Sequence, residues 1–294
     1  MYSIKSRRLF VFVAVPLALT GCGGASGGPG GPGGTTSFTK FPLQSGKSTT
    51  IKGTGREAGY TTDAQGIKVS AFGEASEVQA DLTKNAESGD ISSVALKTGT
   101  TTKTWDHKNS ELAYSKNGKL VIADANDDSG SIGFAIPDKN GFTYQTYGSW
   151  LTKGTDGGKA GAFSIGSETA KADIPTSSTA TFTGTAGGIH IGDRGQDVMS
   201  ADAALNVDFG AKTAAFSTSN TVLENGGAAN NLNMAGDLAI EAGGLSGNIA
   251  TADKGMTGTA NGHFYGSKAQ EVGGTFDLKG GGATMVGGYG AVKQ

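Results

Sequence analysis

The feature that most constrains the fold is a two-residue alternation of apolar and polar side chains throughout residues 179–292. In a β-strand, successive side chains point to opposite faces, so this period indicates strands with one buried face. Eight such runs follow one another, with mostly short connections between them. They lie at residues 180–186, 203–209, 214–218, 234–240, 245–249, 256–264, 272–278 and 286–292.

Eight successive strands with one apolar face predict an up-and-down antiparallel β-barrel over residues 176–294. The expected inward positions alternate Gly or Ala with Phe, Leu and Met. Such side chains fill the narrow interior of an eight-stranded barrel. The outward positions carry Thr, Asn, Asp, Ser and Lys, whereas a membrane barrel needs an apolar outer band and aromatic girdles. We therefore predict a soluble barrel.

We call residues 37–175 the handle. Their sequence pattern predicts a β-rich domain and shows no convincing helix. Alternating or apolar runs lie at residues 67–72, 78–82, 120–123 and 132–136. The Asn-Gly pairs within residues 117–119 and 138–141 predict hairpin turns, and residues 84–111 predict a long loop. Pro175 marks the end of the handle, because the residue before a proline favours an extended backbone. The predicted fold class is all-β, a handle followed by an eight-stranded barrel.

The first 22 residues carry the marks of a lipoprotein signal. A basic start precedes an apolar stretch over residues 9–19, and the stretch ends in Leu19-Thr20-Gly21-Cys22. This order is typical of a secretory signal peptide over residues 1–21, and its end resembles the lipobox of bacterial lipoproteins. The resemblance implies lipidation of Cys22, with acyl chains such as palmitate holding the protein on the membrane. In lipoproteins, an Asp directly after the cysteine commonly retains the protein at the inner membrane. This chain has Gly23 there, which implies that the protein lies in the outer membrane, on its periplasmic or its outer face.

Composition excludes several classes of partner. Residues 22–36 are rich in Gly and Pro and predict a flexible tether. Cys22 is the single cysteine, so a disulfide framework is excluded. The formal net charge of −2 argues against nucleic acid, which needs clustered Lys and Arg. We expect a monomer whose partners are the membrane, through the lipid anchor, and a protein ligand or haem.

Several short motifs lie in and before the predicted barrel. They read GHFYGSKAQEVGGTF at residues 262–276, VGGYGAVK at 286–293, VDFGAKT at 207–213 and ATFTG at 180–184. Together they resemble the barrel domain of transferrin-binding protein B and its relatives, over roughly residues 175–294. Upstream, FTYQTYGSWL at 142–151 resembles the segment that enters the barrel in shorter, single-lobe relatives. These include transferrin-binding-protein-like proteins and, more distantly, factor H binding protein and haemophilin. The resemblance implies a single-lobe surface lipoprotein, whereas the full receptor has two lobes.

No catalytic or metal site is predicted. Serines are numerous, but none stands in a Gly-x-Ser-x-Gly motif, and the chain is not expected to be an enzyme. The three histidines, His107, His190 and His263, lack metal-binding spacing. Each is either a solvated surface histidine or, since haemophilin-like relatives bind haem, a haem ligand. Residues 124–130 resemble a calcium loop but lack its required Gly and Glu, so a polar hairpin turn is the alternative. The glycine pair 187–188 and the glycines at 280–282 predict barrel turns.

Aromatic side chains supply the candidate binding residues. Trp105 and His107 lie in the predicted long loop, and exposed aromatic residues are frequent interface anchors. Tyr144, Tyr147 and Trp150 concentrate aromatic area in a chain with only 7% aromatic residues. These three residues either bind a ligand or pack the handle against the barrel. Trp105 has no alternating apolar neighbours, so we predict that it is exposed and that its loss weakens binding without lowering stability.

Two classes of function remain open at this point. The first is a binding module, a surface lipoprotein that captures a host protein or an iron or haem source through its loops. Such capture needs no catalytic residue. The alternative is a structural or envelope-interaction lipoprotein without a nutrient ligand. Iron limitation separates the two, because a nutrient-capture protein should become more abundant when iron is scarce.

Overall fold

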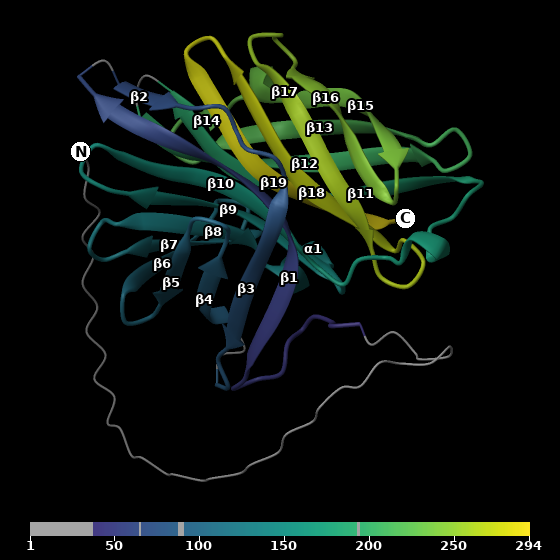
Figure 1. Ribbon diagram of the computed structural model, residues 1–294, viewed down its shortest axis with the longest axis horizontal. Helices are drawn as coiled ribbons and strands as arrows, with labels where there is room; N and C mark the ends of the chain where they lie inside the picture. The colour runs from purple at the N-terminus through teal and green to yellow at the C-terminus, as the bar shows by residue number, and fades with distance from the viewer. Residues whose placement is uncertain (1–37, 65, 88–90, 193–194) are drawn as a thin grey trace. The chain divides into compact units, whose positions relative to one another are not determined.

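The computed structural model describes residues 38–64, 66–87, 91–192 and 195–294, so Cys22, the predicted signal and the predicted tether lie outside the described residues. Residues 38–294 form one compact unit. Its strands make two antiparallel sheets, one from the handle and one from the C-terminal region (Figure 1). The all-β prediction is confirmed. No helix in the described part of the chain is long and apolar enough to cross a membrane.

The C-terminal sheet closes into the predicted barrel. Each strand pairs with its neighbours in sequence, and the first strand pairs with the last to close a ring of eight. The ring strands are β11 (Thr179–Gly192), β12 (Gly195–Asp208), β13 (Thr213–Leu223), β15 (Met234–Glu241), β16 (Gly244–Thr251), β17 (Thr257–Tyr265), β18 (Glu271–Gly280) and β19 (Ala283–Lys293). The short β14 (Gly227–Ala228) pairs with β13 beside the ring. The up-and-down, eight-stranded topology is therefore confirmed.

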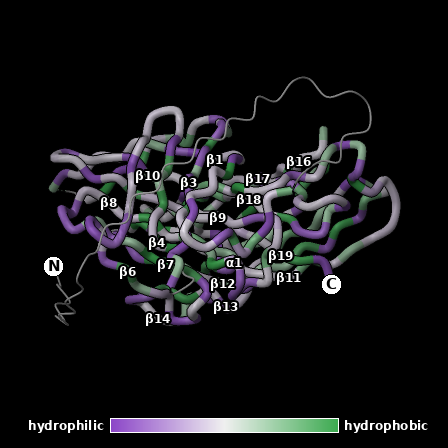
Figure 2. The backbone as a smooth tube through the Cα atoms, turned by 90° about the horizontal axis from the view of Figure 1, so that it is seen from below, coloured by the Kyte–Doolittle hydropathy of each residue, from purple (hydrophilic) through white to green (hydrophobic). Residues whose placement is uncertain are grey.

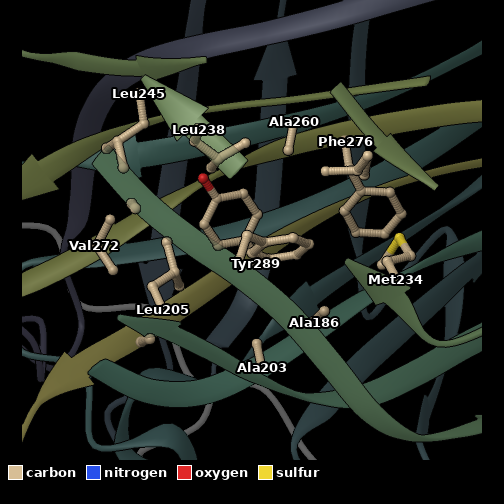
Figure 3. Packing of buried hydrophobic residues seen from close by; sticks show 14 of the residues in the cluster. Ala186, Ala203, Leu205, Met234, Leu238, Leu245, Ala260, Val272, Phe276 and Tyr289 are labelled. Atoms are coloured by element: carbon tan, nitrogen blue, oxygen red, sulfur yellow. The ribbon is translucent and has the colours of Figure 1, made fainter. Parts of the chain in front are cut away.

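Side chains fill the barrel interior. Figure 3 shows the labelled side chains of Leu238, Leu245, Phe276 and Tyr289 lying inside the barrel with alanines between the larger groups. Buried and exposed residues alternate along β13, and the colour of the tube in Figure 2 changes at similarly short intervals along the strands. Each large apolar side chain buried in this way stabilises the fold by about 1.5–3 kcal/mol. The barrel interior is therefore a packed core.

Glycines allow the barrel strands to approach closely. Gly274 of β18 faces β17, and a Cβ atom there would lie 1.8 Å from the backbone oxygen of Asn261. Gly281 and Gly282 form the turn between β18, which ends at Gly280, and β19, as predicted, and all three glycines have positive φ. Gly187 and Gly188, by contrast, lie inside β11 and not in a turn. That prediction was wrong, because a Cβ at Gly188 would meet the backbone of β19, so glycine is needed within the strand.

The handle sheet has ten strands and two open ends. They are β1 (Ser48–Asp63), β2 (Gly66–Val69), β3 (Ser76–Lys84), β4 (Ile91–Lys97), β5 (Thr102–Asp106), β6 (Ser110–Tyr114), β7 (Leu120–Ala125), β8 (Gly130–Ala135), β9 (Gln145–Lys153) and β10 (Gly157–Gly166). Their order is β5-β4-β3-β1-β10-β9-β8-β7-β6, and β2 pairs with β1. The long loop predicted over residues 84–111 was wrong, since β4 and β5 lie within it. Their sheet partners, and not a strong local alternation, place these residues in strands.

Two of the three turns predicted in the handle are present in the structure. Residues 115–119 turn between β6 and β7, with Gly118 at a positive φ. Residues 126–129 connect β7 to β8, so the calcium-like motif is a polar hairpin turn. The hairpin predicted at 138–141 is instead a one-turn helix, α1 (Pro137–Asn140), because Pro137 starts the turn and Gly141 ends it in the left-handed conformation.

The two sheets pack against each other through hydrogen-bonded tyrosines and an ion pair. The Tyr147 and Thr185 hydroxyls lie 2.8 Å apart, and those of Tyr265 and Ser164 lie 2.7 Å apart. Arg56 of β1 lies 2.5 Å from the carboxylate of Asp277 in β18. The connection between β10 and β11 contains one short 3-10 helix, η1 (Lys171–Asp173), followed by Pro175. The domain boundary at residues 175–176 stays a prediction.

Candidate binding surface

An open groove in the handle is the strongest candidate for a binding surface. Its volume is about 450 Å³. Two of its lining residues, Leu112 and Tyr114, are the large apolar side chains that remain exposed among the described residues, at 37% and 58%. We call this surface the handle groove. Its other lining residues are Phe41, Pro42, Leu43, Lys84, Ile91, His107, Val121, Phe134, Ile136, Pro137, Asp138 and Lys139.

The strand register explains why apolar side chains reach this surface. Tyr114 of β6 pairs with Val121 of β7, and Val121 pairs with Phe134 of β8. Paired residues on adjacent strands project to the same face of a sheet. Val121 and Phe134 are buried in the handle core, whereas Tyr114 lies at the end of the sheet. The apolar face of the core therefore continues to the edge strand and becomes exposed there.

The charged side chains that line the handle groove are mainly basic. Lys84 ends β3, while Asp138 and Lys139 belong to α1. His107 follows β5, is exposed and lines the same groove. Two lysines against one aspartate favour an acidic group on a ligand, although exposed charges of this kind steer association more than they add affinity.

Both tryptophans lie in the handle core. Trp105 lies on β5 and is 1% exposed, with its Nε1 3.4 Å from the backbone oxygen of Gly130. The prediction that Trp105 is exposed in a loop was therefore wrong, because the sheet carries it into the core. Trp150 of β9 is fully buried beside Phe163, with the ring centroids 6.2 Å apart. Neither side chain is accessible to a protein ligand.

Tyr144 and Tyr147 lie where the handle meets the barrel. Tyr147 is fully buried, and burial raises the pKa of its hydroxyl above the ordinary value. It packs the handle against the barrel, which is the structural alternative left open by the sequence. Tyr144 is half-buried, with its ring 5.8 Å from that of Phe38 and 5.6 Å from the Lys40 Nζ. A binding role for Tyr144 stays a prediction.

Glu271 is a buried acid at this contact that the sequence did not reveal. It starts β18 and is 2% exposed. Its carboxylate accepts the backbone N–H of Thr143 at 2.6 Å and that of Tyr144 at 3.2 Å. Burial raises the pKa of Glu271 to about 7, although these N–H groups act in the opposite direction. Glu271 therefore joins the start of β18 to the handle segment through two hydrogen bonds.

The histidines lie in three different settings. His107 lines the handle groove, whereas His190 lies near the end of β11 and His263 lies on β17. Burial lowers the pKa of His190, and the Nδ1 of His263 lies 3.7 Å from Glu168. No group of three or more His, Cys, Asp or Glu residues that could hold a metal ion occurs in the described ranges. Haem binding by any of the three histidines stays a prediction.

Comparison with known proteins places the barrel in a family. Residues 174–293 match the family model for the C-lobe and N-lobe beta barrels of Tf-binding protein B. No curated protein sequence matches the chain.

Among solved structures, similar chains include a mutant Transferrin Binding Protein B from Haemophilus parasuis Hp5, with 13% identity, a TM-score of 0.44, and coverage of 85% of this chain and 77% of that one. The isotype 1 Transferrin binding protein B of serogroup B Neisseria meningitidis has 13% identity, a TM-score of 0.42 and coverage of 84% and 77%. A protein named Surface Lipoprotein has 11% identity, a TM-score of 0.46 and coverage of 82% and 98%. The match over residues 174–293 agrees with the range in which the four barrel motifs lie. Residues 174–293 of the chain are therefore similar to the β-barrel domains of Tf-binding protein B.

Proposed function

We propose that the chain is a lipid-anchored surface protein that captures an iron-carrying host protein or haem through its handle groove. The observation that carries the proposal is the exposed apolar groove of the handle, next to a barrel of a binding-protein family. This family consists of non-enzymatic binding proteins, and the chain is not an enzyme. Its function is to be sought in a surface and not in a set of catalytic residues.

The groove has the chemistry of a protein-binding surface. Interface energy is concentrated in a few aromatic or apolar anchors that become desolvated on binding. Tyr114 is such a side chain, exposed at 58%, with Leu112 two residues away on the same face. By contrast, buried apolar side chains fill the interior of the barrel. The handle groove is accordingly the favoured contact surface for a protein partner.

Membrane attachment is the second part of the proposal. Lipidation of Cys22 would hold the protein on the outer membrane, and the Gly- and Pro-rich residues 22–36 would lift the folded unit from it. Exposure to the outside of the cell is the arrangement that capture of a host protein requires.

Iron limitation tests the proposal directly. Protein abundance is measured by quantitative mass spectrometry in cells grown with and without an iron chelator, with repletion of iron as the control. We expect the abundance to rise under chelation and to return on repletion. An unchanged level, together with no retention of transferrin, lactoferrin or haem by the purified protein, would instead favour a structural envelope lipoprotein.

A further inference from the structure

The backbone of β6 has hydrogen-bonding groups that point away from the sheet. The N–H of Ser115 donates to the carbonyl of Leu120 at 3.0 Å, and the N–H of Asn126 donates to Asn109 at 2.8 Å. In an antiparallel pair, residues alternate between facing the partner strand and facing away. Residues 109, 111, 113 and 115 therefore bond to β7. The N–H and C=O groups of Leu112 and Tyr114 point to the open edge.

The other open strands of the handle sheet are at least partly capped. On β5, the side chain of Asn109 donates to the Thr104 carbonyl at 3.0 Å and accepts the Asp106 N–H at 2.9 Å. On β2, the Nζ of Lys279 donates to the Val69 carbonyl at 2.9 Å. Within the described ranges, no comparable partner reaches the outward backbone groups of Leu112 and Tyr114.

This open edge is also the exposed margin of the handle core. Leu112 pairs with Ala123, and Ala123 pairs with Ile132, so exposure falls from 37% to 2% and then to 0% across three strands. Sheet proteins usually protect edge strands with charged side chains, proline or a bulge. The one charged residue of β6, Glu111, pairs with Asp124 and alternates with Leu112 and Tyr114, so it lies on the opposite face. The five residues of β6, SELAY, therefore place no charge, proline or bulge on the apolar face. One additional strand would cover the apolar row and satisfy the backbone groups together.

We propose that an extended polypeptide segment of the captured protein binds as a new strand along β6. This inference rests on the proposed function and specifies its mode of contact. Backbone hydrogen bonds to Leu112 and Tyr114 would fix the segment, and its alternate side chains would lie in the handle groove. Apolar residues suit the side of Val121 and Phe134, and an acidic residue suits Lys84 and Lys139.

The charges favour a partner protein over a second copy of this chain. Pairing β6 with another β6 would bring the two basic grooves together, with Lys84 and Lys139 from both copies. Like charges at an interface oppose association, whereas an acidic segment from another protein is complementary.

The experiment compares two substitutions of one residue. Leu112→Ala removes the side chain and keeps the N–H, whereas Leu112→Pro also removes the N–H that faces the open edge. Proline is tolerated on an edge strand where its missing N–H would face solvent. Ala113→Pro is the matched control, because the N–H of the neighbouring residue bonds to β7 and does not face the open edge. We expect Leu112→Pro to retain its melting temperature relative to Leu112→Ala, and Ala113→Pro to lose stability.

The probe is a displayed library of random twelve-residue linear peptides, selected on the wild-type full chain. We expect enriched peptides that alternate apolar residues and carry an acidic one. Synthetic copies should bind Leu112→Pro at least tenfold more weakly than Leu112→Ala, and should slow amide hydrogen exchange at Leu112 and Tyr114. If Leu112→Pro does not fold, the exchange result on wild type and weakened binding by Tyr114→Ala decide the outcome.

Four results would overturn strand addition. They are the absence of enriched peptides, equal binding by the two Leu112 variants, protection confined to residues outside β6, or concentration-dependent dimerisation that Leu112→Pro abolishes. The last result would make a second copy the occupant. Binding of an iron-carrying protein that is unaffected by Leu112→Pro would leave the proposed function intact and reject this mode. Peptide binding at β6 by a protein that binds no iron-carrying protein and no haem would support strand addition and reject the proposed function.

Discussion

Replacement of Trp105 by alanine should destabilise the protein strongly, because the indole lies inside the handle core. Trp105 is 1% exposed, and the Lys103 Nζ lies 5.5 Å from its ring centroid. Truncation of a buried tryptophan typically costs about 3–5 kcal/mol, from lost burial and the cavity left behind. For a domain of this size, each kcal/mol lowers the melting temperature by about 2–4 °C. The expected decrease is therefore roughly 6–20 °C.

Thermal unfolding followed by circular dichroism measures this effect, with Tyr114→Ala as the matched control. Tyr114 is an aromatic residue of the same sheet, but it is 58% exposed. Its truncation should change the free energy of unfolding by no more than about 0.5 kcal/mol. The reasoning fails if Trp105→Ala has the same melting temperature as the wild type, or if Tyr114→Ala loses as much stability as Trp105→Ala.

Three further predictions concern pH, packing and the anchor. Burial raises the pKa of Glu271 from 4.5 to about 7. Between these two pH values the folded protein retains a proton that the unfolded chain releases. The free energy of unfolding should therefore fall by about 3 kcal/mol as the pH rises from below 4.5 to above 7. Glu271→Gln should flatten this dependence in urea unfolding at pH 5 and pH 8, and an unchanged slope would contradict the assignment. Gly274→Ala should prevent soluble expression, because the added Cβ would lie 1.8 Å from the backbone oxygen of Asn261. The control Gly133→Ala should remain soluble, because its Cβ would lie 3.8 Å from the nearest atom. Equal soluble yields of the two variants would refute the packing argument. Cys22→Ala should abolish incorporation of radiolabelled palmitate, and equal labelling would reject the lipid anchor.

The barrel could be predicted from the sequence because its determinants are local. Phe182, Leu205 and Phe216 each stand in a run where inward and outward residues alternate, and short turns join the runs. An up-and-down order then follows, since each strand pairs with its neighbours in sequence. Gly187 and Gly188 were misread because the close approach of β19 depends on closure of the ring, which local sequence does not encode.

The handle and its groove could be predicted only in part, because long-range pairing decides them. Trp105 has polar neighbours on both sides, and its burial follows from its place in the handle sheet. Tyr114 lies in an ordinary alternating run, and its exposure results from the sheet ending at β6. Glu271 is buried by backbone groups of Thr143 and Tyr144, which lie more than 120 residues earlier in the chain. No sequence signal available for these residues distinguishes such contacts from solvent exposure.

The most direct test of the central claim is equilibrium binding of the purified protein to iron-loaded transferrin, iron-loaded lactoferrin and haem, measured by biolayer interferometry. The account predicts saturable binding of at least one of these ligands. It also predicts that Tyr114→Ala weakens that binding at least tenfold, or about 1.4 kcal/mol, while the protein remains folded. Absence of binding to all three by the folded protein, or equal binding by the wild type and Tyr114→Ala, would contradict it.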